Sequence, residues 1–108
     1  MKYGIPSKTK HNEVAPAQHE VACVYSKVNI TTDNNHLLMQ IMQDIAKKHG
    51  LRCLLHEKPF AGVNGSGKHD NWSVITNTGI NLFNPGNNPA ENKPFIAALA
   101  CTIRAVDM

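Results

Sequence analysis

The sequence is poor in aromatic residues, in cysteine and in long apolar runs, and each shortage excludes a class of protein. No apolar stretch approaches the ~20 residues that a membrane-spanning helix needs, and the N-terminus lacks the apolar centre of a signal peptide. The three cysteines form no Cys-x-x-Cys pair, which argues against a zinc ribbon and a thioredoxin motif. Each lies in an apolar run, as buried free thiols in a reducing compartment do. We therefore expect a cytoplasmic protein with no membrane partner.

Positive charge is in slight excess, but it is not gathered at one place. The formal net charge is +3, from 11 basic and 8 acidic residues, and the lysines are scattered along the chain. A nucleic-acid-binding protein usually concentrates its basic residues on one face, with aromatic residues between them. No such stripe is present, so we expect no nucleic-acid partner. The charge suits an anionic small-molecule substrate at least as well.

Two segments space their apolar residues as amphipathic helices do, at intervals of three and four. The first helix is predicted over residues 33–49, after the N-cap candidates Thr32 and Asp33 and before Gly50, a typical helix terminator. The second is predicted over residues 93–107. Its pattern runs to the last residues without a stop signal, as expected of a piece of a longer protein.

Three short apolar runs, at residues 21–25, 51–55 and 72–76, predict strands. Asparagine, glycine and proline gather at residues 77–79 and 84–89, which predicts turns. The mixed order of strands and helices predicts an α+β fold, with mainly antiparallel strands and two helices. A chain of 108 residues has room for one domain, so residues 1–108 are taken as a single segment.

Residues 62–69 come close to the phosphate-binding P-loop, which is a glycine, four residues, a second glycine and a lysine. Two features disfavour that interpretation. A P-loop needs serine or threonine after the lysine, where this chain has His69 after Lys68. It must also open a helix, whereas a strand-like run follows here. A P-loop nucleotide site stays open as a minor alternative.

Two glutamates, Glu13 and Glu20, lie seven positions apart on either side of Pro16. The proline disfavours one unbroken helix, but two extended pieces joined at Pro16 would bring both carboxylates to one point. Hard divalent cations such as magnesium prefer anionic oxygen ligands. The spacing therefore suggests a metal site, although two solvated surface glutamates are the commoner outcome of such spacing alone.

Both segments together resemble the glutamine synthetase family, and the resemblance covers essentially the whole chain. Residues 58–69 are similar to the family's Lys-Pro…Asn-Gly-Ser-Gly-x-His signature, and residues 12–20 to its Glu-Val-x-Pro-Ala-Gln-x-Glu signature. The wording of residues 8–14 and 54–60 points to the type III form. The resemblance implies that residues 1–108 are a single incomplete segment of the catalytic domain, part of its barrel.

What the resemblance implies is ATP-dependent ligation of ammonia to glutamate through γ-glutamyl phosphate. Two divalent metal ions, Mg²⁺ or Mn²⁺, would neutralise charge on the phosphoryl group and the substrate carboxylate. The two glutamates match ligands of the metal facing glutamate, and the histidine matches a ligand of the metal facing ATP. By position, the metal ligands are Glu13, Glu20 and His69, the glutamate-binding loop contains Asn64 and Gly65, and the nucleotide contacts are Asn71 and Ser73. Some types of the family have histidine at the position of Asn71.

The family's other metal-binding glutamates, its phosphate-binding arginines and its flap glutamate have no counterpart in these 108 residues. Neither has the domain that completes each site from a neighbouring subunit. We therefore expect the isolated chain to be inactive, and the full-length form to be a homo-oligomer. The alternative is a non-catalytic module that associates with itself or with a partner, since missing strands would leave exposed sheet edges.

Overall fold

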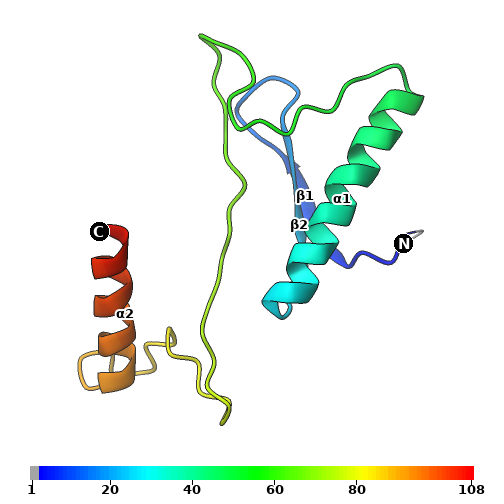
Figure 1. Ribbon diagram of the computed structural model, residues 1–108. Helices are drawn as coiled ribbons and strands as arrows, with labels where there is room; N and C mark the ends of the chain where they lie inside the picture. Colours follow the sequence, from blue (N-terminus) through cyan, green and yellow to red (C-terminus); the bar gives the residue numbers. More distant parts are fainter. Residues whose placement is uncertain (1–2) are drawn as a thin grey trace. The chain divides into compact units, whose positions relative to one another are not determined.

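The computed structural model describes residues 3–108 and has an α+β architecture, as predicted (Figure 1). The chain divides into two compact units, one ending at His69 and the other beginning at Asp70, and each is described here by itself. The elements, in chain order, are β1 (Ser7–Asn12), β2 (His19–Cys23), α1 (Val28–Lys48) and α2 (Lys93–Val106). Across residues 3–108 neither helix combines the length and apolarity that crossing a bilayer requires.

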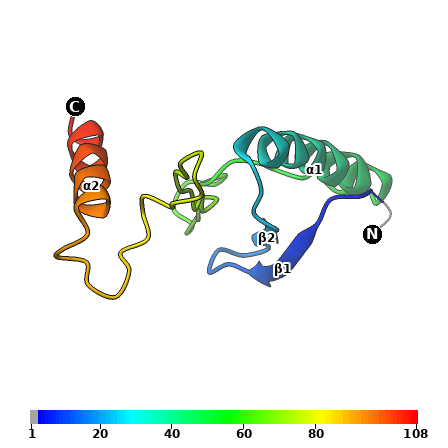
Figure 2. The ribbon, with the colours of Figure 1, turned by 90° about the horizontal axis from the view of Figure 1, so that it is seen from below.

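The first unit is built on an antiparallel hairpin of β1 and β2 (Figure 2). Its register places His11 opposite Glu20. The connecting loop closes where the Glu13 N–H donates to the Gln18 carbonyl oxygen at 2.9 Å. Ala17 in this loop has a positive φ of 55°, which completes the reversal that Pro16 begins. The loop thus joins two extended pieces around Pro16 and brings their facing side chains together.

The strands differ in part from those expected. The apolar run at residues 21–25 does enter a strand, but β2 occupies His19–Cys23, two positions earlier. β1 was not predicted, because Ser7–Asn12 is polar throughout and has no alternating apolar pattern. Its polarity matches its surroundings, since all but one of its residues are exposed.

The predicted strands at residues 51–55 and 72–76 are wrong. Residues 51–55 have no regular structure, and Leu51 is 69% exposed. Of the later run, Ile75 alone pairs, in an isolated bridge with Asn81. Apolar runs become strands only when a neighbouring strand continues the exchange of backbone hydrogen bonds. Residues 51–55 have no such neighbour among the described residues, and the later run has only the short contact across the turn at residues 77–79.

The first helix is confirmed but begins five residues before the predicted start, at Val28 rather than residue 33. The prediction that Thr32 or Asp33 caps it is wrong, because Lys27 is the N-cap and makes no side-chain capping bond. The helix extends because each further residue adds a backbone bond to a helix already nucleated; the Thr31 N–H donates to the Lys27 carbonyl oxygen at 3.0 Å.

The predicted end of α1 is correct and has a clear cause. Gly50 has a φ of +69°, and its N–H donates to the Lys47 carbonyl oxygen at 3.1 Å. The Leu51 N–H donates to the Ala46 carbonyl oxygen at 2.8 Å. This pair of bonds is the Schellman motif, which satisfies the last helical carbonyl groups and favours glycine at the left-handed position.

The second unit contains α2, preceded by turns at residues 77–79, 82–83 and 89–91. Residues 77–79 form the predicted turn, across which the Thr76 N–H donates to the Ile80 carbonyl oxygen at 2.9 Å. The Trp72 and Phe83 rings meet edge to face, with centroids 5.1 Å apart. Asn92 begins α2 by accepting a hydrogen bond from the Phe95 N–H at 3.2 Å. The helix then follows the predicted range closely.

Apolar burial is slight in the part of the chain that the structure describes. The buried apolar residues are Ile5 and Ala15. The stripes predicted for the two helices exist, but Leu37 of α1 and Leu99 of α2 are 47% and 40% exposed. The polar contacts between the hairpin and the segment that follows α1 are therefore the main described links within the first unit.

Candidate functional site

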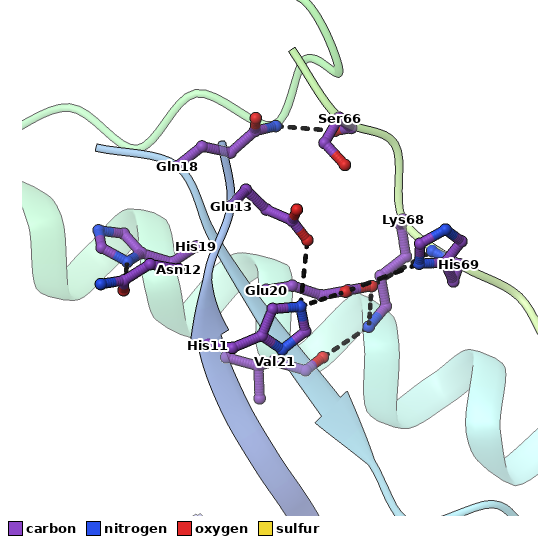
Figure 3. A network of polar contacts seen from close by, with 10 residues as sticks. All are labelled: His11, Asn12, Glu13, Gln18, His19, Glu20, Val21, Ser66, Lys68 and His69. Atoms are coloured by element: carbon purple, nitrogen blue, oxygen red, sulfur yellow. Dashed lines mark hydrogen bonds and ion pairs between the residues drawn. The ribbon is translucent and has the colours of Figure 1, made fainter. Parts of the chain in front are cut away.

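The candidate site lies at the loop end of the hairpin, where residues 66–69 return to the strands (Figure 3). His11 and Glu20 form a directly opposed cross-strand pair and so share one face of the hairpin. Asn12 and His19 form the next pair, on the other face, and bond to each other at 2.8 Å between Oδ1 and Nδ1. The alternation of the two strands thus directs His11 and Glu20 toward the returning segment.

Two carboxylates and one imidazole meet at this point. The His11 Nε2 atom lies 3.1 Å from Glu13 Oε1 and 3.0 Å from Glu20 Oε2. One ligand atom from each of the three side chains lies within 4.8 Å of the others. Both carboxylate side chains are largely shielded, with 17% and 11% of their surface exposed, while the imidazole is 48% exposed. The predicted glutamate pair is therefore brought together, with an imidazole between its members.

The returning segment adds two cationic or potentially cationic groups beside Glu20. The His69 N–H donates to Glu20 Oε1 at 3.2 Å, and the His69 Nδ1 atom lies 3.9 Å from Glu20 Oε2. The Lys68 Nζ atom lies 3.6 Å from Glu20 Oε1 and donates to the Val21 carbonyl oxygen at 2.5 Å. His69 itself is 79% exposed. Glu20 thus contacts both the hairpin cluster and the returning segment, and the His69 imidazole lies beside it.

The pKa of Glu20 lies below its ordinary value because its surroundings favour the charged form. The hydrogen bond from the His69 backbone N–H is the largest cause. Partial desolvation raises the pKa, but the positive charge of Lys68 and the charges of His11 and His69 when protonated lower it. Glu20 is accordingly ionised at neutral pH, and its carboxylate oxygens can act as anionic metal ligands.

A glutamine holds the other end of the returning segment. The Gln18 Nε2 atom donates to the Ser66 carbonyl oxygen at 2.7 Å and lies 3.5 Å from the Glu57 carbonyl oxygen. The Ser66 N–H donates to the same Glu57 oxygen at 3.0 Å. Gln18 therefore connects the hairpin loop to both sides of the glycine-rich turn. The Gln18 Oε1 atom is buried and has no hydrogen-bond partner among residues 3–108.

Gly65 lies where two backbone stretches touch. A Cβ atom placed there would lie 2.9 Å from the Lys58 Cα atom and closer still to the Glu57 carbonyl oxygen. Glycine is expected where backbones approach this closely. The close approach that the structure contains is thus to Glu57 and Lys58, within the turn itself. A glutamate-binding role for Asn64 and Gly65 stays a prediction.

The other predicted contacts lie in the second unit. Asn71 and Ser73 are both exposed there, and their assignment to nucleotide stays a prediction. Residues 70–74 have no regular structure. A P-loop would need a helix directly after Lys68, so the P-loop alternative lacks its defining element.

The two shielded carboxylates fit a hard divalent cation such as Mg²⁺ or Mn²⁺, and the imidazole nitrogens are neutral ligands beside them. His11 was missed in the sequence, although a signal was present. In an extended strand, residues two positions apart point to the same face, so His11 should accompany Glu13. Gln18 belongs to the signature at residues 12–20 and Lys68 to the near P-loop at residues 62–69, but the sequence alone predicts the contacts of neither side chain.

Known proteins match the chain over nearly its whole length. Residues 1–106 match the family described as glutamine synthetase, catalytic domain. The chain is 62% identical over 106 residues to a glutamine synthetase of Butyrivibrio fibrisolvens, which covers 98% of this chain and 15% of that protein. It is 56% identical over 107 residues to the type-3 glutamine synthetase of Dictyostelium discoideum, covering 99% of this chain and 15% of that protein. A Bacteroides fragilis glutamine synthetase is 53% identical over 105 residues, covering 97% of this chain and 14% of that protein. The chain thus spans about 15% of the length of these relatives.

Proposed function

Because the chain belongs to the glutamine synthetase catalytic-domain family, we propose that it supplies part of the active site of a glutamate–ammonia ligase of the type III form. The similarity to a relative that bears the type-3 name supports the finer assignment. In this reaction the γ-carboxylate of glutamate is phosphorylated by ATP, and ammonia then displaces the phosphate. Phosphorylation is needed because a carboxylate is a poor electrophile without a good leaving group.

The observation that carries the proposal is the cluster of Glu13, Glu20 and His11 at the loop end of the hairpin. The His69 Nδ1 atom lies 3.9 Å from one of these carboxylates, that of Glu20. Glu13 and Glu20 would hold one Mg²⁺ or Mn²⁺ ion through their oxygens, and His69 would offer its imidazole to a second. Bound cations would supply electrostatic stabilisation of the phosphoryl group. His11 keeps the two carboxylates at a fixed separation by contacting both.

The substrate assignments follow from the positions of the matching residues. Asn64 and Gly65 would line the glutamate site, and Asn71 and Ser73 would contact ATP. Ammonia completes the substrates. The three free thiols fit the reducing cytoplasm as the compartment.

We further propose that the isolated chain does not turn over, and that activity belongs to the full-length homo-oligomer. The described cluster offers two carboxylates and two imidazoles, fewer ligands than two divalent cations need. The chain also spans about 15% of its relatives. A γ-glutamyl hydroxamate assay with glutamate, ATP and Mn²⁺ tests this, and clear turnover by the isolated chain would contradict it.

Cation binding is the direct test of the site. We expect Mn²⁺ to bind the wild-type chain in an isothermal titration and Mg²⁺ to compete. The double variant Glu13→Gln, Glu20→Gln should lose this binding, because an amide oxygen carries no net charge. Glu91→Gln, which removes an exposed carboxylate from the second unit, is the matched control and should bind normally. Equal binding by the double variant would refute the site.

A second function is favoured by one observation. The apolar faces of both helices are exposed among the described residues, as at Ile96 and Ile103, 44% and 62% exposed. A non-catalytic module that associates with itself would bury such faces. Light scattering distinguishes the two: a concentration-dependent oligomer that binds no Mn²⁺ would favour the module over the partial active site.

A further inference from the structure

Lys68 is the one conspicuous feature of the glycine-rich signature that the proposed function leaves without a role. It stands directly before His69, in the position that resembles a P-loop lysine. Its ammonium group contacts protein, however: it donates to the Val21 carbonyl oxygen at 2.5 Å and lies 3.6 Å from Glu20 Oε1. The Lys68 ammonium thus contacts two groups of β2, a backbone carbonyl oxygen and a carboxylate.

The two contacts have different strengths. The bond to Val21 is short and charge-assisted, whereas the distance to Glu20 is beyond a direct hydrogen bond. The principal effect of Lys68 is therefore structural: its hydrogen bond to Val21 fixes the residue that precedes His69 against the middle of β2. Glu20 directly precedes Val21 in β2, and its Oε1 atom then accepts a hydrogen bond from the His69 N–H at 3.2 Å.

The returning segment is held at two points by described contacts. Gln18 holds Ser66, and Lys68 holds Val21, so residues 66–68 are anchored to the hairpin at both ends (Figure 3). His69 follows the second anchor, and its side chain is 79% exposed and packs against little. Its position depends on the anchor that precedes it.

We propose that Lys68 is a positioning residue, which holds the His69 imidazole beside the Glu20 carboxylate so that the cation held by His69 lies next to the cation held by Glu20. This inference rests on the proposed function, because it assigns Lys68 a part in the cation site suggested above. Lys68 also places a positive charge near that site, which would repel a cation. The Lys68 side chain is 43% exposed, so water and salt screen the repulsion, and the anchoring effect dominates.

The test compares Mn²⁺ affinity in the full chain. Lys68→Met keeps an unbranched side chain one atom shorter and removes the donor, and we expect the affinity to fall about tenfold, the loss typical of one charge-assisted hydrogen bond. Lys68→Arg should recover most of the affinity, because guanidinium N–H groups can donate to the same carbonyl. Lys10→Met is the matched control. It removes the same charge from β1 at a position opposite Val21, on the other face of the hairpin from Glu20.

A double-mutant cycle shows whether Lys68 acts through His69. Lys68→Met should weaken Mn²⁺ binding in the wild-type background and have little further effect in a His69→Ala background. Full additivity, or tighter binding by Lys68→Met alone, would overturn the inference. A metal-free measurement accompanies the cycle: Lys68→Met should shift the His69 amide resonance, which reports the bond to Glu20, while the α1 helix signal stays unchanged.

Different results would refute the cation site and the positioning role of Lys68. If Mn²⁺ binds neither the wild-type chain nor its variants, the cation site is refuted and the positioning role falls with it. If Mn²⁺ binds and broadens the His69 imidazole resonance equally in wild type and Lys68→Met, the cation site stands and the positioning role is refuted.

Discussion

Gly65→Ala should disrupt the turn that carries the returning segment. The added Cβ would lie 2.9 Å from the Lys58 Cα atom and 3.1 Å from its Cβ atom. Carbon atoms in contact prefer about 3.5–4.0 Å, so one backbone must move by about 1 Å. The two atoms nearest the added Cβ, the Lys58 Cα atom and the Glu57 carbonyl oxygen, both belong to the backbone. Neither can rotate away as the end of a flexible side chain would.

The magnitude follows from two effects. Overpacking in a close contact typically costs about 1–3 kcal/mol. The forced separation also weakens the bond from the Ser66 N–H to the Glu57 carbonyl oxygen, 3.0 Å long in the structure, which contributes about 1 kcal/mol. We therefore expect local destabilisation of about 2–4 kcal/mol, together with weaker Mn²⁺ binding because the same turn carries His69.

Gly67→Ala is a matched control two residues away. A Cβ there would meet the Glu57 side chain at 3.5 Å, an ordinary contact with a movable group. Amide hydrogen exchange at Ser66 is the assay: exchange should accelerate strongly in Gly65→Ala and stay close to wild type in Gly67→Ala. Equal protection of Ser66 in both variants would refute the argument from close backbone approach.

Two further predictions concern a helix cap and a carboxylate. Asn92→Ala should destabilise α2 by about 1 kcal/mol, because it removes the acceptor for the Phe95 N–H; circular dichroism should show lower helicity than in the control Asn87→Ala. The pKa of Glu20 is lowered from 4.5 in the folded state, so its contribution to stability is present above that value and is lost as the pH falls through the lower, folded-state pKa. Protection of the His69 amide, whose N–H binds Glu20, should therefore fall in acid but not between neutral pH and about pH 5, when its exchange rate is divided into the intrinsic rate at each pH; protection that is unchanged in strong acid would contradict this.

The helices could be predicted from the sequence because their signals are local. Apolar spacing located both, Gly50 marked the end of α1, and the polar turn before Lys93 marked the start of α2. The start of α1 was misplaced because no capping side chain marks it. Local patterns therefore gave the helical interiors and those ends where a specific side chain or glycine closes the backbone hydrogen bonds.

The strands were harder because a strand depends on a partner that its own sequence does not specify. Ser7–Asn12 is polar and forms β1, whereas residues 51–55 are apolar and form no strand. The difference lies in the loop around Pro16, which returns the chain so that β1 and β2 can pair. Local apolarity was a poor guide where pairing decided the outcome.

The candidate site shows a similar division. The spacing of Glu13 and Glu20 suggested a metal site, because hard divalent cations prefer carboxylate oxygens, and the resemblance to a family signature added His69. His11 and Lys68 could not be given their contacts, because these depend on the hairpin register and on where residues 66–69 return. Pairwise geometry between distant segments was the missing information.

The scarcity of apolar burial explains why these contacts matter for the site. With Ile5 and Ala15 as its buried apolar residues, the described part of the chain cannot position the returning segment by core packing. Hydrogen bonds from Gln18 and Lys68 do so instead. Such bonds contribute about 1 kcal/mol each when neutral and somewhat more when charged, so a single substitution can release one end of the segment. In the longer relatives further packing would share this load, and the same substitutions should then affect cation affinity more than folding.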